Sequence, residues 1–373
     1  MDASVLTAPI ALARDKSKKN ETIKREEWMA GTNRRWLLET RPQGMIKDTD
    51  FRLDEGPIPE PGEGEFLVRV TDLSFDPTQR GWLAADTYLP AVKIGAPVRA
   101  GAVGQVIKSS HPGFQPGQMV QGTFGWQEYV VTKGMTETGP VAPVRKGITP
   151  EQALGVFGVT GLTAWFGLTD VGQPKAGDTV LVSGAAGATG SVVVQVARAL
   201  GCKVIGIAGG PDKCRWVTDV AGADYCIDYK RENVAATIRA QAPKGVNVVF
   251  ENVGGDILEA ALMNLALRAR IVLCGGISSY NAEDLSQMQG LRSYMQLTVM
   301  RARMEGFIIL DYAPRWGEGV AALSKLIAEG KLKTLEDVQH GFENCPATLR
   351  RLFEGKNLGK QLLKLTAPPL PVV

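Results

Sequence analysis

The residue pattern with the clearest chemistry is a glycine loop, Gly184-Ala-Ala-Gly-Ala-Thr-Gly190. The loop follows an apolar, β-branched run at Thr179–Ser183 and precedes a segment of buried-helix character at Ser191–Leu200. In such a strand–loop–helix unit, glycines let the backbone lie close to a pyrophosphate, and the first amides of the helix bind its charge. A plain tight turn is the alternative, but the alternating strands and helices around the loop favour a dinucleotide site.

The end of the next expected strand, Lys203–Ala208, indicates which dinucleotide binds. An NAD site usually carries Asp or Glu there to hold the ribose hydroxyls, whereas this strand is followed by Gly209 and Gly210. Lys213, at the start of the next expected helix, could bind a 2′-phosphate, and Tyr229 could add a hydroxyl to it. A solvated lysine and a half-buried surface tyrosine remain the alternatives. We therefore expect NADPH as the cofactor.

Metal and hydrolase chemistry find little support in the sequence. A zinc site needs clustered His, Cys or acidic ligands, yet the chain has two histidines and five cysteines, with no CxxC pair and no cysteine before position 202. No GxSxG hydrolase motif occurs. We therefore predict a reaction without a metal ion. The residues concerned are His111, His340, Cys202, Cys214, Cys226, Cys274 and Cys345.

Composition and charge disfavour several classes of partner. Of 373 residues, 44% are hydrophobic and 22% charged, which is ordinary for a globular protein. A net charge of +3 is too small to indicate nucleic acid or an anionic membrane as the main partner. No apolar run reaches the ~18–20 residues of a membrane span. The odd number of scattered cysteines favours a reducing compartment, and we expect the cytoplasm.

Residues 1–28 differ from the rest of the chain. Their polar and charged runs lack apolar periodicity, so we expect a disordered extension. The apolar run Val5–Ala13 follows Asp2 rather than a basic region, which argues against a secretory signal. A mitochondrial transit peptide stays open, although the acidic residues of the stretch disfavour it.

The remaining chain divides into two regions with different patterns of predicted secondary structure. From Arg34 to about Pro143, short alternating segments such as Phe66–Val70 lie between Gly and Pro turns, which predicts a β domain resembling a partly open barrel. From about Thr160, strands and helices alternate, which predicts a parallel sheet wound on both faces. The tail from Phe342 is expected to rejoin the first domain. The later expected strands are Tyr225–Asp228, Val246–Phe250, Arg270–Cys274 and Phe307–Leu310.

Five motifs, in this order and spacing, resemble those of a known family. They are Gly161-Leu-Thr-Ala164, the glycine loop, Glu251-Asn-Val-Gly-Gly255, Cys274-Gly-Gly-Ile-Ser-Ser-Tyr-Asn281 and Glu305-Gly-Phe307. Over roughly residues 33–365 the chain resembles the zinc-independent medium-chain dehydrogenases/reductases, which include prostaglandin, plant 2-alkenal and bacterial curcumin reductases. The resemblance implies a GroES-like β domain at 29–158 and 341–373, a Rossmann NADP-binding domain at 159–340, and a homodimer.

The resemblance also implies roles for single residues. Gly209, Lys213 and Tyr229 match positions around the adenosine 2′-phosphate, and Tyr280 matches a tyrosine near the nicotinamide ribose and the substrate carbonyl. The full set of implied cofactor positions is Thr163, Gly184, Ala186, Gly187, Ala188, Thr189, Gly190, Gly209, Lys213, Tyr229, Asn252, Cys274, Ile277, Tyr280, Phe307, Ile308 and Asn357.

One departure concerns the substrate side. Where the family commonly reads Asp-Pro-Tyr-Met-Arg, this chain has Asp76-Pro77-Thr78-Gln79-Arg80. Smaller or more polar groups replace the tyrosine and the methionine. The departure leaves the size and preference of the substrate open, though not the hydride chemistry.

The resemblance implies hydride transfer from NADPH to the β-carbon of an α,β-unsaturated aldehyde or ketone. Tyr280 and a ribose hydroxyl are the expected donors to the oxygen where negative charge develops, and a structural loop tyrosine is the alternative for Tyr280. Quinone reduction is a rival reaction, and a non-enzymatic NADPH-binding protein is a rival from another class.

Overall fold

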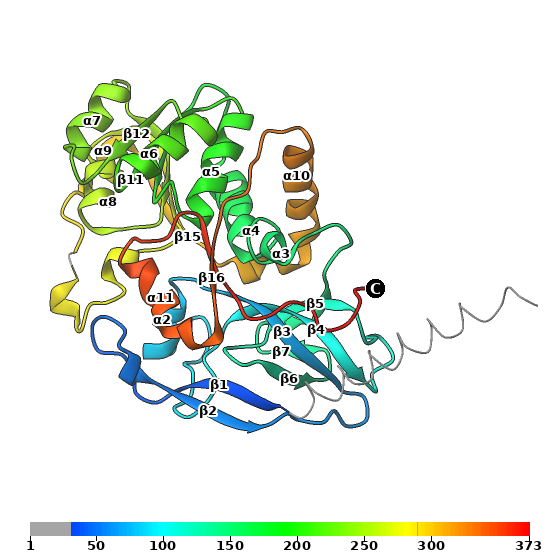
Figure 1. The fold of residues 1–373 in the computed structure, drawn as a ribbon. Coiled ribbons are helices and arrows are strands. Elements are labelled where there is room, and N and C mark those ends of the chain that lie inside the picture. The colour runs from blue at the N-terminus through cyan, green and yellow to red at the C-terminus, as the bar shows by residue number, and fades with distance from the viewer. Residues whose placement is uncertain (1–30, 289) are drawn as a thin grey trace, which may run out of the picture.

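The computed structural model describes residues 31–288 and 290–373, and the expected extension at residues 1–28 lies outside them. The chain forms two bodies, one around a six-stranded sheet and one around a seven-stranded sheet (Figure 1). Within the described part of the chain, no helix is long and apolar enough to cross a membrane.

The six-stranded sheet is parallel throughout. Its spatial order is β12-β11-β10-β13-β14-β15, which is the order of the Rossmann fold with β10 as the first strand. The predicted doubly wound domain is therefore confirmed. Its strands are β10 (Thr179–Ser183), β11 (Lys203–Ala208), β12 (Tyr225–Asp228), β13 (Val246–Glu251), β14 (Leu265–Leu273) and β15 (Arg303–Gly306).

Helices cover both faces of this sheet, and each face has its own hydrophobic cluster. Val180 and Val182 of β10 belong to one cluster and Leu181 to the other, which explains why this strand is apolar at every position. The helices are α4 (Val159–Phe166), α5 (Ala188–Ala199), α6 (Pro211–Arg215), α7 (Val234–Gln241), α8 (Gly255–Leu262), α9 (Met295–Met300) and α10 (Trp316–Ala328).

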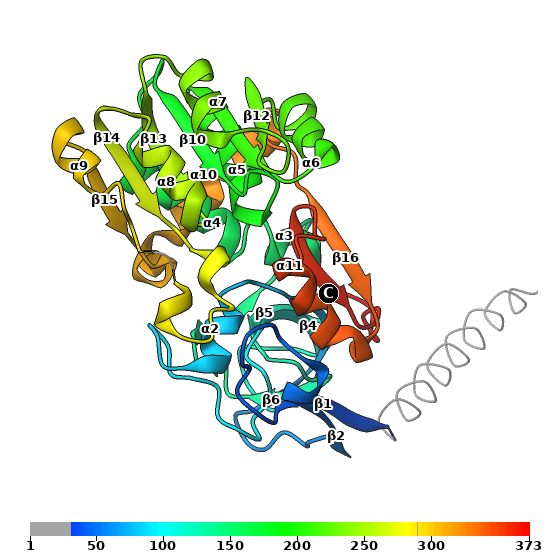
Figure 2. The same cartoon turned by 90° about the vertical axis from the view of Figure 1, so that its left-hand side faces the viewer.

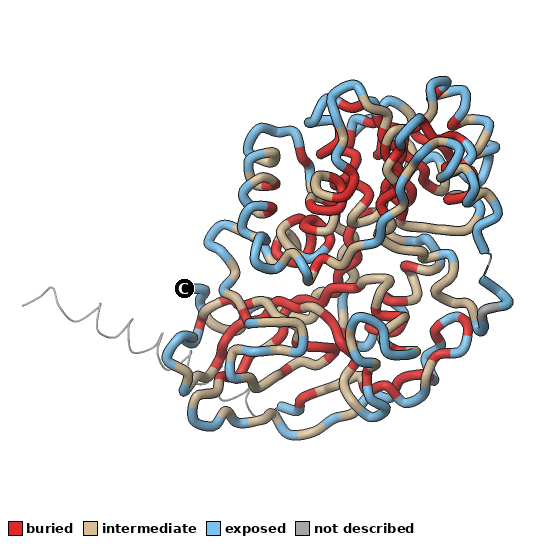
Figure 3. The backbone as a smooth tube through the Cα atoms, turned by 180° about the vertical axis from the view of Figure 1, so that it is seen from behind, coloured by how far each residue is buried: buried red, intermediate tan, exposed pale blue. Residues whose placement is uncertain are grey.

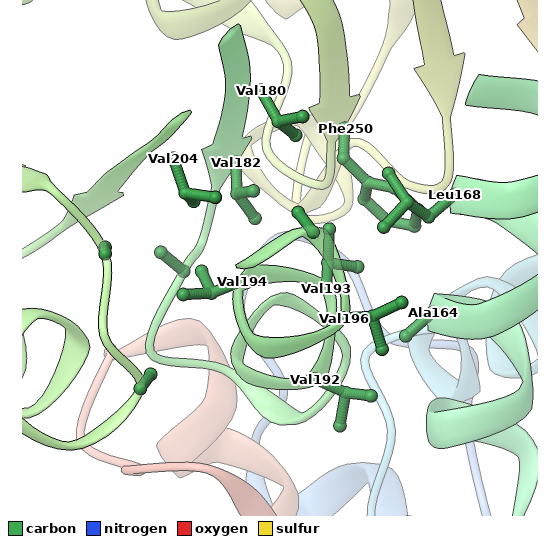
Figure 4. Close-up of a cluster of buried hydrophobic side chains, with 14 of the residues drawn as sticks. Ala164, Leu168, Val180, Val182, Val192, Val193, Val194, Val196, Val204 and Phe250 are labelled. Carbon is green, nitrogen blue, oxygen red and sulfur yellow. The ribbon is translucent and has the colours of Figure 1, made fainter. Parts of the chain in front are cut away.

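Helix α5 is apolar on most sides because it is enclosed. Val193 and Val194 are fully buried in the cluster that also holds Val182 of β10 and Ala164 of α4, and Figure 4 shows these side chains around the helix. A helix without a polar face is a buried helix. This packing fixes the start of α5, and therefore the glycine loop before it, at the carboxyl end of β10.

The second body is a mainly antiparallel β domain, as the sequence predicts. Its sheet runs β16-β17-β3-β4-β5-β9, with β6 also paired to β3, and it lies below the Rossmann domain in Figure 2. Figure 3 shows buried backbone running through both sheets and exposed backbone in the turns. The elements are β1 (Thr32–Leu38), β2 (Phe51–Pro57), β3 (Phe66–Ser74), α2 (Gln79–Ala84), β4 (Gly101–Ser109), β5 (Met119–Thr123), β6 (Tyr129–Thr132), β7 (Met135–Thr136), β8 (Gly139–Pro140), β9 (Ala142–Pro143), α3 (Pro150–Leu154), β16 (Glu336–His340), α11 (Cys345–Phe353) and β17 (Lys360–Lys364).

The chain returns to the β domain through β16. This strand falls within the range expected for the Rossmann domain, yet it pairs in parallel with β17, and β17 pairs with β3. Most residues of β16 are half-buried and polar, so no apolar run marks them in the sequence.

The expected strand at Phe307–Leu310 is wrong. The last strand of the Rossmann sheet, β15, ends at Gly306, and a 3-10 segment follows at Ile309–Arg315. Because β15 is an edge strand with mostly exposed residues, it lacks the apolar pattern of the inner strands. The apolar residues after it are partly buried for another reason, since the ring of Phe307 packs against Gly167.

We predict that Phe250→Ala lowers the free energy of unfolding by about 3–5 kcal/mol, because it empties a buried aromatic site. Phe250 is a fully buried residue of β13, and its side chain faces the residues around α5 (Figure 4). Chemical denaturation measures the effect. Leu267→Ala is the matched control, since Leu267 is 53% exposed and should change the value by no more than about 0.5 kcal/mol. Equal effects of the two substitutions would contradict this account of the core.

Candidate active site

The glycine loop turns directly from β10 into α5. Gly184 has φ of +60°, and the amide of Gly187 donates to the carbonyl of Gly184 at 2.9 Å. The first bond within the helix runs from Ser191 N to Gly187 O at 3.0 Å. The amides of Ala188, Thr189 and Gly190 precede this bond, so they have no acceptor in the helix and can bind an anion.

Gly190 is required by a close approach of backbone to backbone. A Cβ at Gly190 would lie 2.2 Å from the carbonyl oxygen of Gly184. A Cβ at Gly206 of β11 would meet the Cβ of Ala185 at 2.9 Å. These contacts hold the turn tightly against the sheet and leave its backbone clear of side chains, which fits a pyrophosphate.

Gly209 and Tyr229 contact each other at the carboxyl ends of β11 and β12, and Lys213 lies on α6, which follows this turn. A Cβ at Gly209 would lie 2.8 Å from the ring of Tyr229, so only glycine lets this ring lie flat on the turn. Lys213 donates from Nζ to the carbonyl of Gly355 at 2.8 Å. Burial lowers the pKa of Lys213, and the positive charge of Lys230 lowers it further. Lys213 follows β11 and Lys230 follows β12, so both lysines belong to the segments in which a 2′-phosphate is expected.

Sequence reasoning missed Asp228, the last residue of β12. The register of the sheet places it beside Ala208, at the end of β11. Its carboxylate accepts the amides of Gly210 at 2.8 Å and Lys230 at 3.1 Å, so it shapes the turn rather than standing free for a ribose hydroxyl. An acid was sought only at the end of β11, and Asp228 comes from β12.

The loops after β13 and β14 join the end of β10. The side chain of Asn252 donates to the carbonyl of Ser183 at 2.7 Å, and the carbonyl of Asn252 accepts the amide of Ile277 at 3.2 Å. Cys274 is half-buried nearby, and burial raises the pKa of its thiol to about 12. The thiol of Cys274 therefore stays protonated near neutral pH, which does not suit a nucleophile.

Glu251 is a second residue that sequence reasoning quoted in a motif without giving it a role. Its Oε1 accepts from Ser183 Oγ at 2.9 Å and from the amides of Val253 at 2.5 Å and Gly254 at 2.6 Å. Burial raises its pKa. The carboxyl group thus fixes the loop after β13 to the strand that carries the glycine loop. An acid at the end of a buried strand was the available signal.

Tyr280 folds back over its own loop after a 3-10 turn at Ile277–Ser279. Its hydroxyl oxygen accepts the amide of Gly276 at 3.2 Å, and a Cβ at Gly275 would lie 3.1 Å from the same oxygen. The bond from Gly276 uses a lone pair and leaves the phenolic proton for another acceptor. Burial raises the pKa of Tyr280, so the phenol stays protonated near neutral pH.

Tyr280 lines a cavity of about 420 Å³ between the two domains. The facing wall comes from α2 and from the loop after β1, and Figure 2 shows α2 beside the segment that follows β14. Arg80 is buried in this wall and donates to the carbonyls of Pro42 at 3.1 Å and Gly44 at 3.0 Å. The lining residues are Arg41, Pro42, Gln43, Arg80, Gly81, Ala84, Ser279, Tyr280, Ala282, Glu283 and Met288.

The two departures from the family pattern have different places. Gln79 is buried, and it accepts from Asp76 N at 3.0 Å and donates to the carbonyl of Arg99 at 2.9 Å. Thr78 is hydrogen-bonded through Oγ1 to the hydroxyl of Tyr88 at 2.9 Å. Gln79 is therefore a buried, hydrogen-bonded structural residue, whereas the side chain of Thr78 joins the start of α2 to the loop that carries Tyr88.

The remaining expected cofactor residues come from α4, from the segment after β15 and from the tail. Thr163 is half-buried on α4, one turn before Gly167, which contacts Phe307, and Ile308 follows Phe307 in the chain. In the tail, Asn357 donates to the carbonyl of Gly359 at 3.0 Å. Gly359 N in turn donates to Ala186 O at 2.8 Å, so the tail touches the glycine loop directly.

Among residues 31–288 and 290–373, no group of three or more His, Cys, Asp and Glu side chains could hold a metal ion. His111 accepts the amide of Gly113 through Nδ1 at 3.0 Å, as a turn residue does. The Rossmann sheet, its glycine loop and the tyrosine-lined cavity define a two-domain, dinucleotide-dependent oxidoreductase.

Comparison with known proteins narrows this class. A family model described as the N-terminal domain of oxidoreductase matches residues 34–139, and one described as zinc-binding dehydrogenase matches residues 188–325. An NADPH-dependent curcumin reductase of Escherichia coli is 39% identical over 89% of this chain and 97% of its own. A 2-alkenal reductase (NADP(+)-dependent) of Nicotiana tabacum is 35% identical over 90% of this chain and 98% of its own. The structure of CurA from Vibrio vulnificus in complex with NADPH is 40% identical with a TM-score of 0.85, over 90% of this chain and 100% of that one.

The chain belongs to the zinc-independent medium-chain dehydrogenase/reductase family that includes the curcumin, 2-alkenal and prostaglandin reductases. The resemblance found in its motifs is thereby confirmed. The predicted fold, with a GroES-like β domain and a Rossmann domain, is confirmed as well.

We predict that Gly190→Ala weakens dinucleotide binding at least tenfold, because its Cβ would press on the carbonyl of Gly184 and move the loop. Fluorescence titration of the bound nicotinamide measures the dissociation constant. Gly317→Ala on α10 is the control, since a Cβ there meets nothing within 4 Å. Wild-type affinity in Gly190→Ala would show that the loop does not carry the pyrophosphate.

Proposed function

We propose that this protein reduces the carbon–carbon double bond of α,β-unsaturated aldehydes or ketones with NADPH. The observation that carries the proposal is the Tyr280 phenol, which accepts a backbone amide, keeps its proton for donation and lines the cavity between the domains. Relatives named as curcumin, 2-alkenal and prostaglandin reductases support the reaction. The related structure solved with NADPH supports the cofactor.

The residues around the glycine loop fit this cofactor. The free amides at the start of α5 would bind the pyrophosphate. Lys213 and Tyr229, on the turn at Gly209, would bind the 2′-phosphate. The other residues that would line the cofactor are Thr163, Asn252, Cys274, Ile277, Phe307, Ile308 and Asn357.

When bound, NADPH supplies a hydride to the β-carbon of the substrate. The task of Tyr280 is to donate its proton in a hydrogen bond to the carbonyl oxygen, where negative charge collects. The amide of Gly276 strengthens that donation, because a hydroxyl that accepts a hydrogen bond becomes a better donor. Solvent can protonate the α-carbon, so the chain needs no acid–base pair. Its main contribution is to hold the two reactants in contact.

A substrate panel separates this proposal from its rivals. Purified protein with NADPH is offered an enal, an enone, a quinone and an alcohol, and loss of NADPH absorbance is followed. We expect turnover of the enal and the enone with saturated carbonyl products. Turnover of the quinone alone would favour a quinone reductase, and tight NADPH binding without any turnover would favour a binding protein.

The edge of the Rossmann sheet supports the proposal of a homodimer, and the cysteines support the proposal of the cytosol. Strand β15 is at the edge of the sheet, and near it Tyr294, Met295 and Val299 are each more than half exposed. An unpaired edge beside exposed apolar side chains is a typical interface. The five free cysteines suit a reducing compartment. Sedimentation at micromolar concentration is expected to give twice the chain mass, and a monomer would refute the assembly.

We predict that Tyr280→Phe lowers kcat for an enone and leaves NADPH affinity nearly unchanged. Loss of a main oxyanion donor costs on the order of 3 kcal/mol, and we expect less because the ribose hydroxyl remains as a donor. Single-turnover rates isolate the chemical step. A mutant with the wild-type rate of that step would return Tyr280 to a structural role in its loop.

We predict that Lys213→Ala weakens NADPH binding by roughly ten- to a hundredfold and leaves NADH binding nearly unchanged. A hydrogen bond to a charged group contributes about 1.5–3 kcal/mol, and about 1.4 kcal/mol is tenfold in affinity. Fluorescence titrations give both dissociation constants, and the effect should shrink as salt rises.

The matched control is Arg215→Ala, on the same short helix, because Arg215 pairs with Asp212 at the surface. Its NADPH affinity should stay near that of the wild type. Equal losses for NADPH and NADH in Lys213→Ala would mean that Lys213 only tethers the tail through Gly355.

A further inference from the structure

Tyr88 is a polar residue on the loop that follows α2, the helix whose residues Arg80, Gly81 and Ala84 line the cavity. It is carried by the loop Asp86–Pro90, which follows α2, and it is 45% exposed. Its hydroxyl bonds to Thr78 Oγ1 at 2.9 Å, and its ring meets Trp82 edge-on with centroids 6.2 Å apart. Burial raises the pKa of Tyr88, and the charges of Asp76 and Tyr280 raise it further.

The loop lies against the wall of the cavity. Arg80 and Gly81 of α2 line the cavity, and a Cβ at Gly81 would lie 3.8 Å from the methyl group of Thr87. The amide of Val92 donates to the carbonyl of Trp82 at 2.8 Å, which returns the chain to α2. The position of the Tyr88 hydroxyl therefore depends on what presses this loop onto α2.

Arg99 makes the contacts that hold this loop against α2. Its Nη1 donates to the carbonyl of Pro90 at 2.9 Å, and its guanidinium carbon lies 5.5 Å from the centroid of the Trp82 ring. Its Nε donates to Glu137 at 2.5 Å, and its carbonyl accepts from Gln79 at 2.9 Å. One side chain thus connects the end of the loop, α2 and the β7–β8 turn.

The cost of burying this guanidinium points to a specific use. The side chain of Arg99 is 5% exposed, whereas that of Glu137 is 66% exposed and can be served by water. A buried ion of this kind contributes little net stability compared with an apolar residue of similar size. What Arg99 provides, and an apolar residue cannot, is the bond to Pro90 and the cation–π contact with Trp82.

We propose that Arg99 is a positioning residue that clamps the Asp86–Pro90 loop onto α2, so that the Tyr88 hydroxyl, shared with Thr78, holds a polar group of the substrate opposite Tyr280. The proposal rests on the proposed function for the identity of the substrate. It makes Arg99 a determinant of KM rather than of the hydride step. Neither Arg99 nor Tyr88 touches the glycine loop, so NADPH binding should be independent of both.

Hydrogen exchange tests the clamp without any substrate. In the protein without cofactor, Arg99→Met should increase deuterium uptake in the peptide that covers residues 86–92. The matched control is Glu137→Gln, which removes the negative charge, retains an oxygen that can accept from Arg99 Nε and keeps the contacts to Pro90 and Trp82, so its deuterium uptake should stay near that of the wild type. Unchanged uptake in Arg99→Met, with an unchanged melting temperature, would overturn the clamp.

Kinetics test the link to the substrate. For the enone that the wild type reduces best, Arg99→Met should raise KM by roughly three- to tenfold, the effect of one lost hydrogen bond, with kcat and the NADPH dissociation constant nearly unchanged. Tyr88→Phe should raise KM similarly, and the double mutant should be no worse than either single one. Multiplying effects, or an unchanged KM in Arg99→Met, would show that Arg99 does not act through Tyr88.

Two further readouts keep the outcomes distinct. If Arg99→Met fails to fold, Arg99→Lys is the second variant, because it keeps the positive charge and loses the planar guanidinium with its several donors. The same changes in deuterium uptake and in KM are then expected, but smaller. If the wild type reduces no enone, the proposed function fails, while hydrogen exchange still decides whether Arg99 holds the loop.

Discussion

The two halves of the site are held in register by a short piece of the tail, Gly359-Lys360. Gly359 N donates to Ala186 O in the glycine loop at 2.8 Å. The next residue, Lys360, is almost fully buried and reaches into the β domain, where Nζ contacts the carboxylate of Asp76 at 2.5 Å and the carbonyl of Phe75 at 3.2 Å. Adjacent residues of the tail therefore contact the glycine loop and the segment that precedes α2.

This arrangement explains why the site needs both domains. Tyr280 comes from the Rossmann domain and Arg80 from the β domain, yet they line one cavity. A buried lysine that lost its carboxylate would leave an uncompensated charge, which costs about 3–5 kcal/mol, so Lys360 and Asp76 resist separation. Glu251 is buried in a different way: three donors surround its Oε1, its Oε2 has no hydrogen-bond partner among the described residues, and burial raises the pKa of the carboxyl group.

The parts of the fold that were predicted correctly are those where burial requires a continuous run of apolar residues. Strands β10 to β13 lie inside a sheet covered on both faces, so their apolar runs mark them within about a residue. Strands β15 and β16 are polar or exposed, and the sequence misplaced the first and did not show the second. The glycine loop was visible because its constraint is local: Gly184 and Gly190 touch one another.

Other parts of the site depend on contacts that no local pattern encodes. Lys360 meets Asp76 across 284 positions, and the carbonyl of Arg99 receives the side chain of Gln79 from a separate segment. The substitution at Thr78 was visible in the sequence, but its partner Tyr88 was not. Such pairs form only when the fold brings distant segments together, so their chemistry could be recognised only in the structure.

Transfer of hydride from labelled NADPH to the β-carbon of an enone would leave an isotopic label on that carbon. The most direct measurement uses NADPH deuterated at the transferable position of the nicotinamide, with the product examined by NMR. We expect a saturated ketone with one deuterium on the former β-carbon. An allylic alcohol with deuterium on the former carbonyl carbon would contradict hydride transfer to the β-carbon.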